Sequence, residues 1–500
     1  MKTLHEKMES MEAVRNRMNG KKNLEELLVD GESMTHGDKD LLVNALVSDS
    51  RRVTPGCAFF AMPGIRDDGA NFIKDAIDRG AHAIITEKDS VEIPSSVAKI
   101  KVSDTRKTLA RLARRYHGSP DAALDLVGVT GTNGKTTVST LTRHLLEEPG
   151  KPVGLIGTVR YHLGDREVPS FRTTPESADL YPLLKSMLVA GCSEAVMEVS
   201  SHGIHQQRVS GLELEVAAFL NLSRDHLDYH DGMEDYFREK RKIFNGENGS
   251  LPKIAVINGD CPYGLRLIES LPPQVRVLKF GFGEENEFKA KNLVVNEKGT
   301  EFLLESPNGS HVVTSPMLGR YNVMNLLASL AILHALGRDV ADSIRKVGSF
   351  QGVDGRMETI EKGQGYKVVV DYAHTPDSYN KVMITLKELQ GDKGHIYVVF
   401  GAGGDRDKSK RSHMAQILET YARHCFITPD NPRYEEQNQI NAQIVKGFKS
   451  NKYSIFDNRN QGIEAAIKVS KKNDIVAILG KGREKYQDIQ GKKIYHSDLD

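Results

Sequence analysis

The stretch Gly128-Val-Thr-Gly-Thr-Asn-Gly-Lys-Thr-Thr137 decides the fold expected for the middle of this chain. It follows an apolar run at 124–129 and precedes a helical pattern at 138–146, which predicts a strand, a glycine loop and a helix N-terminus. Such a loop suits a polyphosphate, because its backbone N–H groups and the helix dipole both favour negative charge. Lys135 adds a positive charge, and the Thr136 hydroxyl can bind Mg²⁺. The alternative is a glycine turn with a solvated lysine, but the flanking strand and helix favour a nucleotide site.

The spacing within this loop is shorter than the common phosphate-loop spacing. The common form would place a glycine where this chain has Val129, so the loop is a Gly-x-x-Gly-Lys-Thr version from Gly131 to Thr136. The pattern indicates nucleotide binding without saying what the nucleotide is used for.

The composition excludes several other classes of protein. A chain of 500 residues is too long for one hydrophobic core and predicts about three domains. The net charge of +1 and the pI near 7.7 give no reason to expect nucleic acid or an anionic membrane as partner. There is no membrane-spanning run of about eighteen apolar residues and no signal peptide at the charged N-terminus. The four cysteines lack metal-ligand spacing, so we expect a cytoplasmic protein with reduced thiols.

Short apolar runs alternate with helical patterns along most of the chain, which predicts parallel sheets with crossover helices. Boundaries are expected near the segments YHGSPDAAL and FQGVDGRME, which contain glycine and proline or several turn residues. We therefore predict an α/β protein with a polar N-terminal extension at 1–22, a small α/β domain at 23–122, a central parallel-sheet domain at 123–352 and a C-terminal α/β domain at 353–500.

Polar clusters follow several of the expected central strands, where ligands bind in open parallel sheets. In VMEVSSHG, Glu198 could complete the shell of a Mg²⁺ ion bound by Thr136, or could merely cap the next helix. In FLNLSRDHLDYH, a dense group of Asp and His suggests metal binding, although Asp225 could equally be an N-cap and His230 a packing residue. Composition alone would place Lys240 on a solvated helix face.

The last third of the sequence contains three further polar segments after apolar runs. VVVDYAHTPDS supplies Asp371 and His374, and FGAGGDRDKSKR is a glycine turn that either binds an anion or forms a polar surface loop. In TPDNPRYEE, Pro432 stiffens the turn and the planar guanidinium of Arg433 suits a carboxylate. Taken alone, the last segment is an ordinary turn.

These motifs in this order resemble the Mur ligases, ATP-dependent enzymes that form the amide bonds of the peptidoglycan stem peptide. The resemblance runs from about Leu24 nearly to the end of the chain, and its nearest branch adds the third amino acid of the stem. It depends on the ordered segments DSRRVTPGCAFFAMPG, GVTGTNGKTT, RTTPES, MEVSSH, NLSRDHLDYH, GRME, DYAHTPD, GGDRDKSKR, DNPR and GKG. It implies a UDP-binding N-terminal domain, a central phosphate-loop ATPase domain and a Rossmann-like C-terminal domain that binds the amino acid.

The resemblance also implies roles for individual residues. Lys135, Glu198, His226 and Lys240 match the catalytic positions, and Thr136, Glu198, His226 and a carbamylated Lys240 would hold two Mg²⁺ ions. ATP would contact Gly131, Thr132, Asn133, Gly134, Lys135, Thr136, Thr137, Asn322, Asn325, Arg356, Asp371 and His374. The UDP-linked sugar-peptide would contact Ser50, Thr173, Thr174, Ser200, Gln206 and Arg208. The incoming amino acid would contact Arg406, Asp430, Asn431, Arg433, Gly480 and Glu484.

The implied reaction joins an amino acid to UDP-MurNAc-L-Ala-D-Glu through an acyl phosphate, with ATP and Mg²⁺ as cofactors. It would serve peptidoglycan and cell-wall synthesis, and through them cell shape and division. DNPR matches the signature for meso-diaminopimelate, whose distal carboxylate Arg433 and Arg406 could grip, whereas an arginine would repel the ammonium of lysine. Two positions depart from the family pattern: Arg483 replaces a histidine, and the Glu-x-Pro that commonly follows DNPR is absent at Tyr434–Gln437.

These departures leave open a ligase for lysine or another amino acid, or a paralogue in a specialised pathway. A nucleotide-binding module without catalysis is disfavoured, because Lys135, Glu198, His226 and Lys240 occur together. Nothing in the sequence indicates an extended interface, so we expect a monomer.

Overall fold

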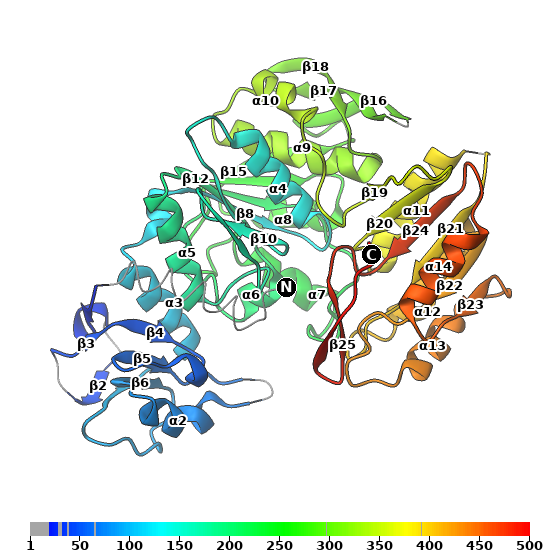
Figure 1. The fold of residues 1–500 in the computed structure, drawn as a ribbon. Coiled ribbons are helices and arrows are strands. Elements are labelled where there is room, and N and C mark those ends of the chain that lie inside the picture. Colours follow the sequence, from blue (N-terminus) through cyan, green and yellow to red (C-terminus); the bar gives the residue numbers. More distant parts are fainter. Residues whose placement is uncertain (1–19, 29–32, 38–39, 65–66, 297, 392) are drawn as a thin grey trace.

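A computed structural model describes residues 20–500 except 29–32, 38–39, 65–66, 297 and 392. Most of the extension predicted at 1–22 lies outside these residues. The described chain forms three main α/β units that follow one another along the sequence, coloured blue, cyan to yellow-green, and yellow to red in Figure 1. No helix within these residues is long and apolar enough to cross a membrane.

The first unit contains a five-stranded sheet in the order β2-β7-β6-β5-β4. Its strands are β2 Ser33–His36, β4 Ala45–Val47, β5 Cys57–Phe60, β6 Ala83–Thr86 and β7 Ala98–Lys101, beside a small pair β1 Lys22–Asn23 and β3 Leu42–Val43. The helices are α2 Ile73–Asp78 and α3 Thr105–Tyr116, with short 3₁₀ turns η1 Glu25–Leu27, η2 Ser50–Arg52, η3 Gly69–Phe72 and η4 Pro120–Ala123. Helix α3 begins where the Asp104 side chain accepts hydrogen bonds from two first-turn N–H groups.

The central unit is built on an eleven-stranded sheet in the order β11-β10-β9-β12-β8-β13-β14-β15-β16-β17-β18. Strands β9 to β16 in that order pair in parallel, as the alternating sequence pattern predicts. These parallel strands are β8 Asp125–Thr130, β9 Gly154–Ile156, β12 Glu194–Glu198, β13 Val216–Phe219, β14 Ile254–Asn258, β15 Arg276–Gly281 and β16 Phe288–Asn296. The helices are α4 Lys135–Leu146, α5 Ser177–Val189, α6 Ser201–His205, α7 Met233–Arg241, α8 Pro262–Glu269, α9 Arg320–Ala335 and α10 Val340–Val347.

Both edges of this sheet are antiparallel, which the sequence pattern did not reveal. One edge adds β10 Arg160–His162 and β11 Glu167–Pro169, and the other adds β17 Gly299–Ser306 and β18 Gly309–Ser315. Strand β16 alternates half-buried and exposed side chains along 291–296, because only one face of this edge packs on the core. The parallel centre therefore holds the phosphate loop, and the hairpins extend the sheet beyond it.

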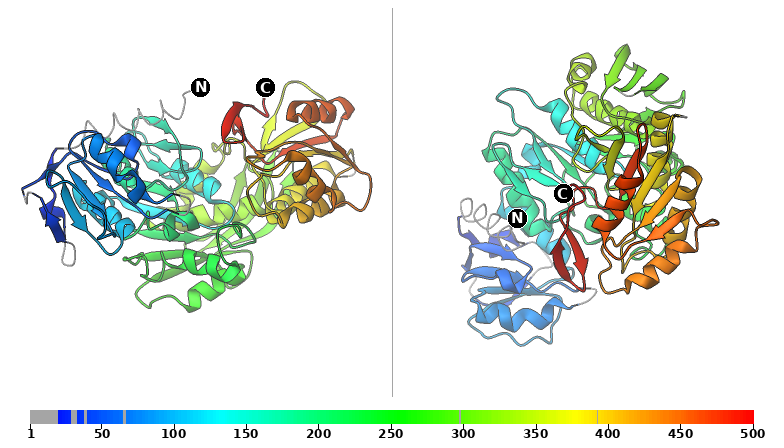
Figure 2. Two further views of the ribbon diagram at one scale, coloured as in Figure 1. Left: turned by 90° about the horizontal axis from the view of Figure 1, so that it is seen from below. Right: turned by 45° about the vertical axis from the view of Figure 1, so that its right-hand side comes forward.

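The C-terminal unit has a six-stranded sheet in the order β19-β20-β24-β21-β22-β23. The strands are β19 Glu358–Ile360, β20 Lys367–Asp371, β21 Ile396–Phe400, β22 His424–Ile427, β23 Tyr453–Ile455 and β24 Ile475–Leu479, with β19 the antiparallel member. Helices α11 Pro376–Gln390, α12 Lys410–Tyr421, α13 Gln437–Val445 and α14 Arg459–Val469 pack on this sheet. A hairpin of β25 Tyr486–Ile489 and β26 Lys492–Tyr495 extends from it, in dark red in Figures 1 and 2.

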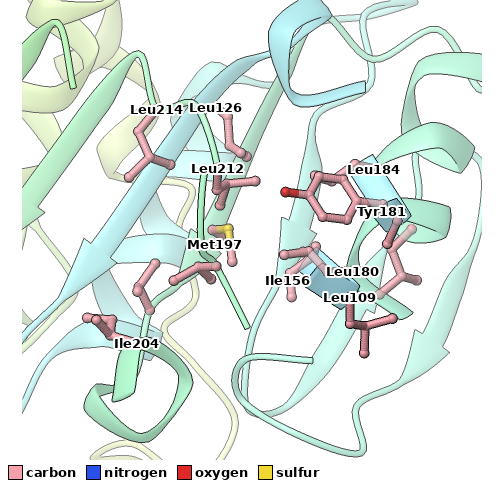
Figure 3. Close-up of a cluster of buried hydrophobic side chains, with 14 of the residues drawn as sticks. Leu109, Leu126, Ile156, Leu180, Tyr181, Leu184, Met197, Ile204, Leu212 and Leu214 are labelled. Atoms are coloured by element: carbon pink, nitrogen blue, oxygen red, sulfur yellow. The ribbon is translucent and has the colours of Figure 1, made fainter. Parts of the chain in front are cut away.

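The hydrophobic core is shared between the first two units but not with the third. One cluster of buried side chains runs from the first unit into the central unit, and in Figure 3 Leu109 of α3 lies beside Leu180 of α5, with Tyr181 and Leu184 further along that helix. The clusters of the C-terminal unit contain only residues from 357 onward among the described residues. The first two units are therefore joined by apolar packing, and the third is packed around its own core.

Candidate functional site

The glycine loop has the geometry that the sequence predicts. It connects β8 to α4, and Gly131 and Gly134 have φ of +157° and +92°. A Cβ at position 134 would lie 2.5 Å from Oδ1 of Asn325, so only glycine fits there. The Lys135 ammonium curls back and donates to the Gly131 and Thr132 carbonyls at 2.8 and 2.9 Å. Burial lowers the pKa of Lys135.

Glu198 lies at the end of β12, against the start of α4. Its Oε2 accepts a hydrogen bond from Thr136 Oγ1 at 3.1 Å and another from Thr158 Oγ1 at 3.0 Å. It does not cap the next helix, because the Ser200 side chain takes that role for α6. The residues that the sequence pairs as oxygen donors are therefore adjacent, a donor set that fits Mg²⁺.

Lys240 is buried and does not lie on a solvated face of α7. Its Nζ donates to the Gly131 carbonyl at 3.1 Å and to Thr130 Oγ1 at 3.3 Å, and lies 4.8 Å from the centre of the Tyr236 ring. Burial, together with the nearby charge of Lys135, lowers the pKa of Lys240 well below its usual value. The Nζ is therefore held close beneath the phosphate loop, in surroundings that disfavour its charged form.

His226 lies next to this lysine in an unusual backbone conformation. Its φ is +55°, in the left-handed region that few non-glycine residues adopt. Its ring is 6.0 Å from that of Tyr236, which Lys240 also contacts, and burial lowers the pKa of His226 well below its usual value. The neutral imidazole is the form that binds a metal ion. His230, in contrast, stacks on Tyr236 as a packing residue.

A cavity of about 520 Å³ connects the loop to the C-terminal unit. From the predicted ATP, metal and catalytic positions it is lined by Thr132, Asn133, Gly134, Lys135, Thr136, Thr137, Glu198, His226, Asn322, Asn325, Arg356, Asp371 and His374. From the predicted substrate positions it is lined by Thr173, Thr174, Ser200, Arg208 and Arg406. Thr132 and Arg406, which are 274 positions apart in the chain, thus line the same cavity.

The predicted ATP positions outside the phosphate loop come from both the central and the C-terminal unit. Asn325 donates to Asn322 across one turn of α9 at 3.0 Å. Opposite them, Arg356 lies over the Tyr372 ring at 4.5 Å and donates to Thr136 Oγ1 at 3.3 Å. Asp371 accepts two backbone N–H bonds at 2.6 Å, from Met357 and Ala373, and burial raises its pKa.

The predicted sugar-peptide positions form a hydrogen-bonded group beside Glu198, except for one. Thr174 bonds Ser200 at 3.1 Å, Arg208 donates to the Thr174 carbonyl at 2.9 Å and to Gln206 at 2.5 Å. Thr173 bonds Thr158, a partner of Glu198, at 3.0 Å. Ser50 is buried in η2 of the first unit and does not line the cavity.

The predicted amino-acid positions meet at the carboxyl ends of β22 and β24. Asn431 donates to Glu484 at 2.8 Å, and a Cβ at Gly480 would lie 2.7 Å from Asp430 Oδ2. Arg433, with φ of +51°, donates to the Gly404 carbonyl at 2.7 Å. A Cβ at Gly403 would lie 3.0 Å from Arg433 Nη1 and 3.7 Å from Arg406 Cγ, so both arginines adjoin this glycine turn.

The structure gives a place to one residue that the sequence analysis did not mention, Lys481, and to one whose role it left open, Asp225. Lys481 is fully buried and donates to Asn431 and Glu484 at 3.2 and 2.5 Å. Asp225 is no N-cap: it lies between the two units, 3.4 Å from Lys410 and 3.8 Å from His374. Only the fold brings these partners together, because 185 positions separate Asp225 from Lys410. Tyr372 could have been noted from its place in the DYAH segment.

The glycine turn GGDRDKSKR is mostly exposed at 405–409 and ends in two buried residues at the start of α12. Arg411 is fully buried and contacts Glu435 at 3.0 Å, and Lys410 is buried beside Asp225. In the described residues, no group of three or more His, Cys, Asp or Glu could hold a metal ion by itself. Any Mg²⁺ at Thr136 and Glu198 would therefore complete its shell with phosphate oxygens and water, as Mg²⁺ commonly does.

Comparison with known proteins identifies the family and the fold. The class is a ligase with a phosphate loop: the Mur ligase catalytic domain matches 43–117, the Mur ligase middle domain 129–333, and the Mur ligase glutamate ligase domain 355–482. The UDP-N-acetylmuramoyl-L-alanyl-D-glutamate–2,6-diaminopimelate ligase of Listeria innocua is 41% identical over 461 residues, which cover 91% of this chain and 92% of that protein. The ligase of the same name from Geobacillus kaustophilus is 39% identical, covering 93% and 94%. The chain belongs to the Mur ligase family.

Solved structures agree with this assignment. A structure of a UDP-N-acetylmuramoyl-L-alanyl-D-glutamate–2,6-diaminopimelate ligase superposes with a TM-score of 0.67 at 31% identity, covering 96% of this chain and 97% of the other. The MurF ligase of Thermotoga maritima in complex with ADP superposes with a TM-score of 0.63 at 23% identity, covering 87% and 93%, and shares the fold.

Proposed function

We propose that this ligase uses ATP to add meso-diaminopimelate to UDP-N-acetylmuramoyl-L-alanyl-D-glutamate in peptidoglycan synthesis. The observation that carries the proposal is the single cavity shared by the phosphate loop, the sugar-peptide group and Arg406. The names of the relatives from Listeria innocua and Geobacillus kaustophilus support the same substrates.

In the first step the D-glutamyl γ-carboxylate attacks the γ-phosphate of ATP, the bond between the γ-phosphate and the β-phosphate oxygen breaks, and an acyl phosphate and ADP form. Lys135 is placed to exchange its two loop carbonyls for phosphate oxygens, and its charge offsets theirs. Thr136 and Glu198 would hold a Mg²⁺ ion, which supplies further neutralisation of the phosphates. The amino group of the incoming amino acid then attacks the acyl phosphate, and loss of phosphate leaves the amide. No side chain needs to form a covalent intermediate.

We propose that Lys240 is carbamylated in the active enzyme. A neutral amine is the form that reacts with CO₂, and the burial that lowers the pKa of Lys240 favours it. The product is a carboxylate next to Lys135, and these opposite charges attract where two ammonium groups would repel each other. His226 and the carbamate would hold a second Mg²⁺ ion. Mass measurement of intact protein kept in bicarbonate should show one added CO₂ that Lys240→Ala lacks.

The amino-acid pocket has the charges that diaminopimelate needs. Arg406 and Arg433 adjoin Gly403 and can bind a distal carboxylate, while Asp430 and Glu484 can bind the distal ammonium. Lysine has no such carboxylate and would leave the arginines unpaired. Arg483 does not alter this balance, because its guanidinium pairs with Glu358, outside the group formed by Asn431 and Glu484.

The test is phosphate release from ATP with UDP-MurNAc-dipeptide and a panel of amino acids. We expect turnover with meso-diaminopimelate and little with lysine, and none in Lys135→Ala. Turnover with lysine but not with diaminopimelate would overturn the amino-acid assignment. Absence of turnover with every amino acid would point to a specialised paralogue or a binding protein.

We further propose that 23–122 binds UDP, 123–352 binds ATP and 353–500 binds the amino acid, and that the enzyme acts as a monomer in the cytoplasm. Supporting this division, Ser50, the phosphate loop and the DNPR turn lie in three different units. ATP and UDP-linked precursors are cytoplasmic metabolites, which supports the location. Light scattering of the purified protein would test the oligomeric state.

A further inference from the structure

Two loops of the C-terminal unit touch through their backbones. The linker, defined as residues 352–358, enters this unit, and the amino-acid loop, residues 480–484, follows β24. Gly355 and Gly482 have φ of +69° and +53°. A Cβ at position 355 would lie 2.6 Å from the Arg483 nitrogen and 2.9 Å from the Gly482 Cα. The loops can approach this closely only because both positions are glycine.

The Arg483 side chain stabilises this contact between the two loops. Its Nε donates to Glu358 Oε2 at 2.8 Å, and its Nη2 bonds the other oxygen of the same carboxylate. Glu358 also accepts the Gly355 N–H at 2.8 Å. The bidentate geometry fixes the direction of the guanidinium, which a histidine at this position could not reproduce.

Further ion pairs connect Arg483 to the central unit. Arg483 Nη1 lies 3.5 Å from Asp354 Oδ2, which accepts from Arg160 of β10 at 2.9 Å. Arg160 in turn pairs with Glu167 of β11 at 2.8 Å. Charges of alternating sign thus run from the antiparallel edge of the central sheet, across the linker, to the amino-acid loop.

The two joined loops hold groups for different ligands. The linker contains Arg356, which bonds Thr136 of the phosphate loop, and the amino-acid loop contains Glu484, which bonds Asn431. Tyr372 lies between them: its N–H donates to the Gly355 carbonyl at 2.9 Å, and its ring lies under the Arg356 guanidinium. A shift of either loop therefore displaces the other.

We propose that Arg483 is a positioning residue that clamps the amino-acid loop to the linker, so that the ATP and amino-acid sites are held in register by one ion pair. The assignment of the two ligands rests on the proposed function, whereas the clamp itself rests on the Arg483–Glu358 pair and the close approach of Gly355 to Gly482. Arg483 touches neither ligand and acts through Arg356 and Glu484.

The first test is steady-state kinetics of Arg483→Ala. We expect kcat/KM for ATP and for diaminopimelate to fall by similar factors, about three- to tenfold, because one clamp serves both loops. A loss confined to diaminopimelate would place Arg483 in the amino-acid pocket, and no loss would leave it a surface charge; both results overturn the proposal. The matched control is Arg266→Ala, which removes an exposed bidentate pair with Glu234 on the central unit and should change neither value.

The second test is a double-mutant cycle with a conservative variant. Glu358→Ala should match Arg483→Ala, and the double alanine variant should be no worse than either single one. Arg483→Lys keeps a positive charge beside Glu358 and Asp354 and should recover part of the lost kcat/KM, which a merely destabilising substitution would not. Additive losses, or failure of Arg483→Lys to recover activity in a protein with unchanged melting temperature, would contradict the clamp.

The third test needs no turnover and separates the clamp from the proposed function. Hydrogen exchange of the peptides covering 352–358 and 480–484 should rise together in Arg483→Ala and stay unchanged in Arg266→Ala. If wild-type protein shows no ligation yet this paired rise occurs, the proposed function fails and the clamp stands. If wild-type protein ligates diaminopimelate but the two segments respond independently, the clamp fails and the function stands.

Discussion

The first unit meets the central unit through leucine and tyrosine side chains, whereas the C-terminal unit meets it through charged and polar groups. On the first side, α3 and α5 pack into one buried cluster, assisted by an Arg52–Asp179 pair at 2.8 Å. On the second side the contacts include Asn133 to Asp377 at 2.8 Å and Lys410 to Asp225 at 3.4 Å. Separating two units at an apolar junction exposes buried side chains to water and costs free energy. At a polar junction the separated groups can bind water or ligand instead of each other, so the cost is small.

The two junctions therefore differ in whether substrate binding can alter them. A polar junction is typical of domains that move relative to each other, and a continuous core is typical of a rigid pair. We expect the first two units to move as one body, with the phosphate loop and the sugar-peptide group fixed on it. The C-terminal unit, which carries Arg356 and the amino-acid group, would adjust its position as the cavity fills.

The largest effect is expected from opening the apolar junction. Leu180→Ala removes a fully buried side chain of α5 and should lower the free energy of unfolding by about 2–5 kcal/mol. Hydrogen exchange during urea titration should show the first and central units losing protection together. Leu265→Ala, at a 48% exposed position on α8, is the control and should have little effect. Loss of protection in the first unit alone would contradict a shared core.

A smaller effect is expected from the centre of the polar junction. Asp225→Asn removes the negative charge between Lys410, His226 and His374. We expect kcat/KM to fall about 10- to 100-fold, because the groups left buried beside position 225 disfavour closure of the C-terminal unit on the central unit. The melting temperature should change little. Steady-state assays and thermal denaturation measure the two effects. Asp231→Asn, at an exposed position nearby, should behave like wild type. A large drop in melting temperature would make this junction as structural as the apolar one.

A more selective effect is expected from the amino-acid side of the C-terminal unit. Arg433→Ala should raise the KM for diaminopimelate about tenfold, the loss of one charged hydrogen-bonding partner, and leave the KM for ATP within twofold. Initial-rate measurements with each substrate varied would show this. Equal changes in both KM values would remove Arg433 from the amino-acid pocket.

The smallest effect is expected from salt. Raising ionic strength shortens the screening length, so turnover should fall a few-fold as partly exposed pairs across the polar junction weaken, while the apolar junction keeps its unfolding free energy. Arg224→Ala removes contacts to Ser409 and Asp407 across this junction, so its turnover should depend less on salt. An identical salt dependence in this variant would attribute the effect to the charged substrates instead.

The sequence was most informative where the pattern is local. The phosphate loop follows from glycines that must have positive φ, a strand before them and a helix after them, all between positions 125 and 146. The parallel centres of the larger sheets follow from continuous apolar runs. The antiparallel edges were missed, because short half-buried strands such as β10 and β11 differ little from loops.

The candidate site divides in the same way. Thr136, Glu198 and the DNPR turn are recognisable as strand-end motifs, and resemblance to the family adds roles that spacing cannot supply. The sequence could not predict three further features: the burial of Lys240, the position of Asp225 between two units, and the pairing of Arg483 with Glu358. Each depends on which residue lies opposite, and those partners are 110, 185 and 125 positions away.

The phosphate loop, the parallel α/β units and the ordered motifs of a Mur ligase can be predicted from the residues alone, because they depend on periodicity and on residues close in the chain. Which units share a core, and which partners Lys240, Asp225 and Arg483 contact, follows from the folded structure. Burial, charge pairing and the depressed pKa of Lys240 are properties of surroundings that distant segments create, so they exist only once the chain has folded.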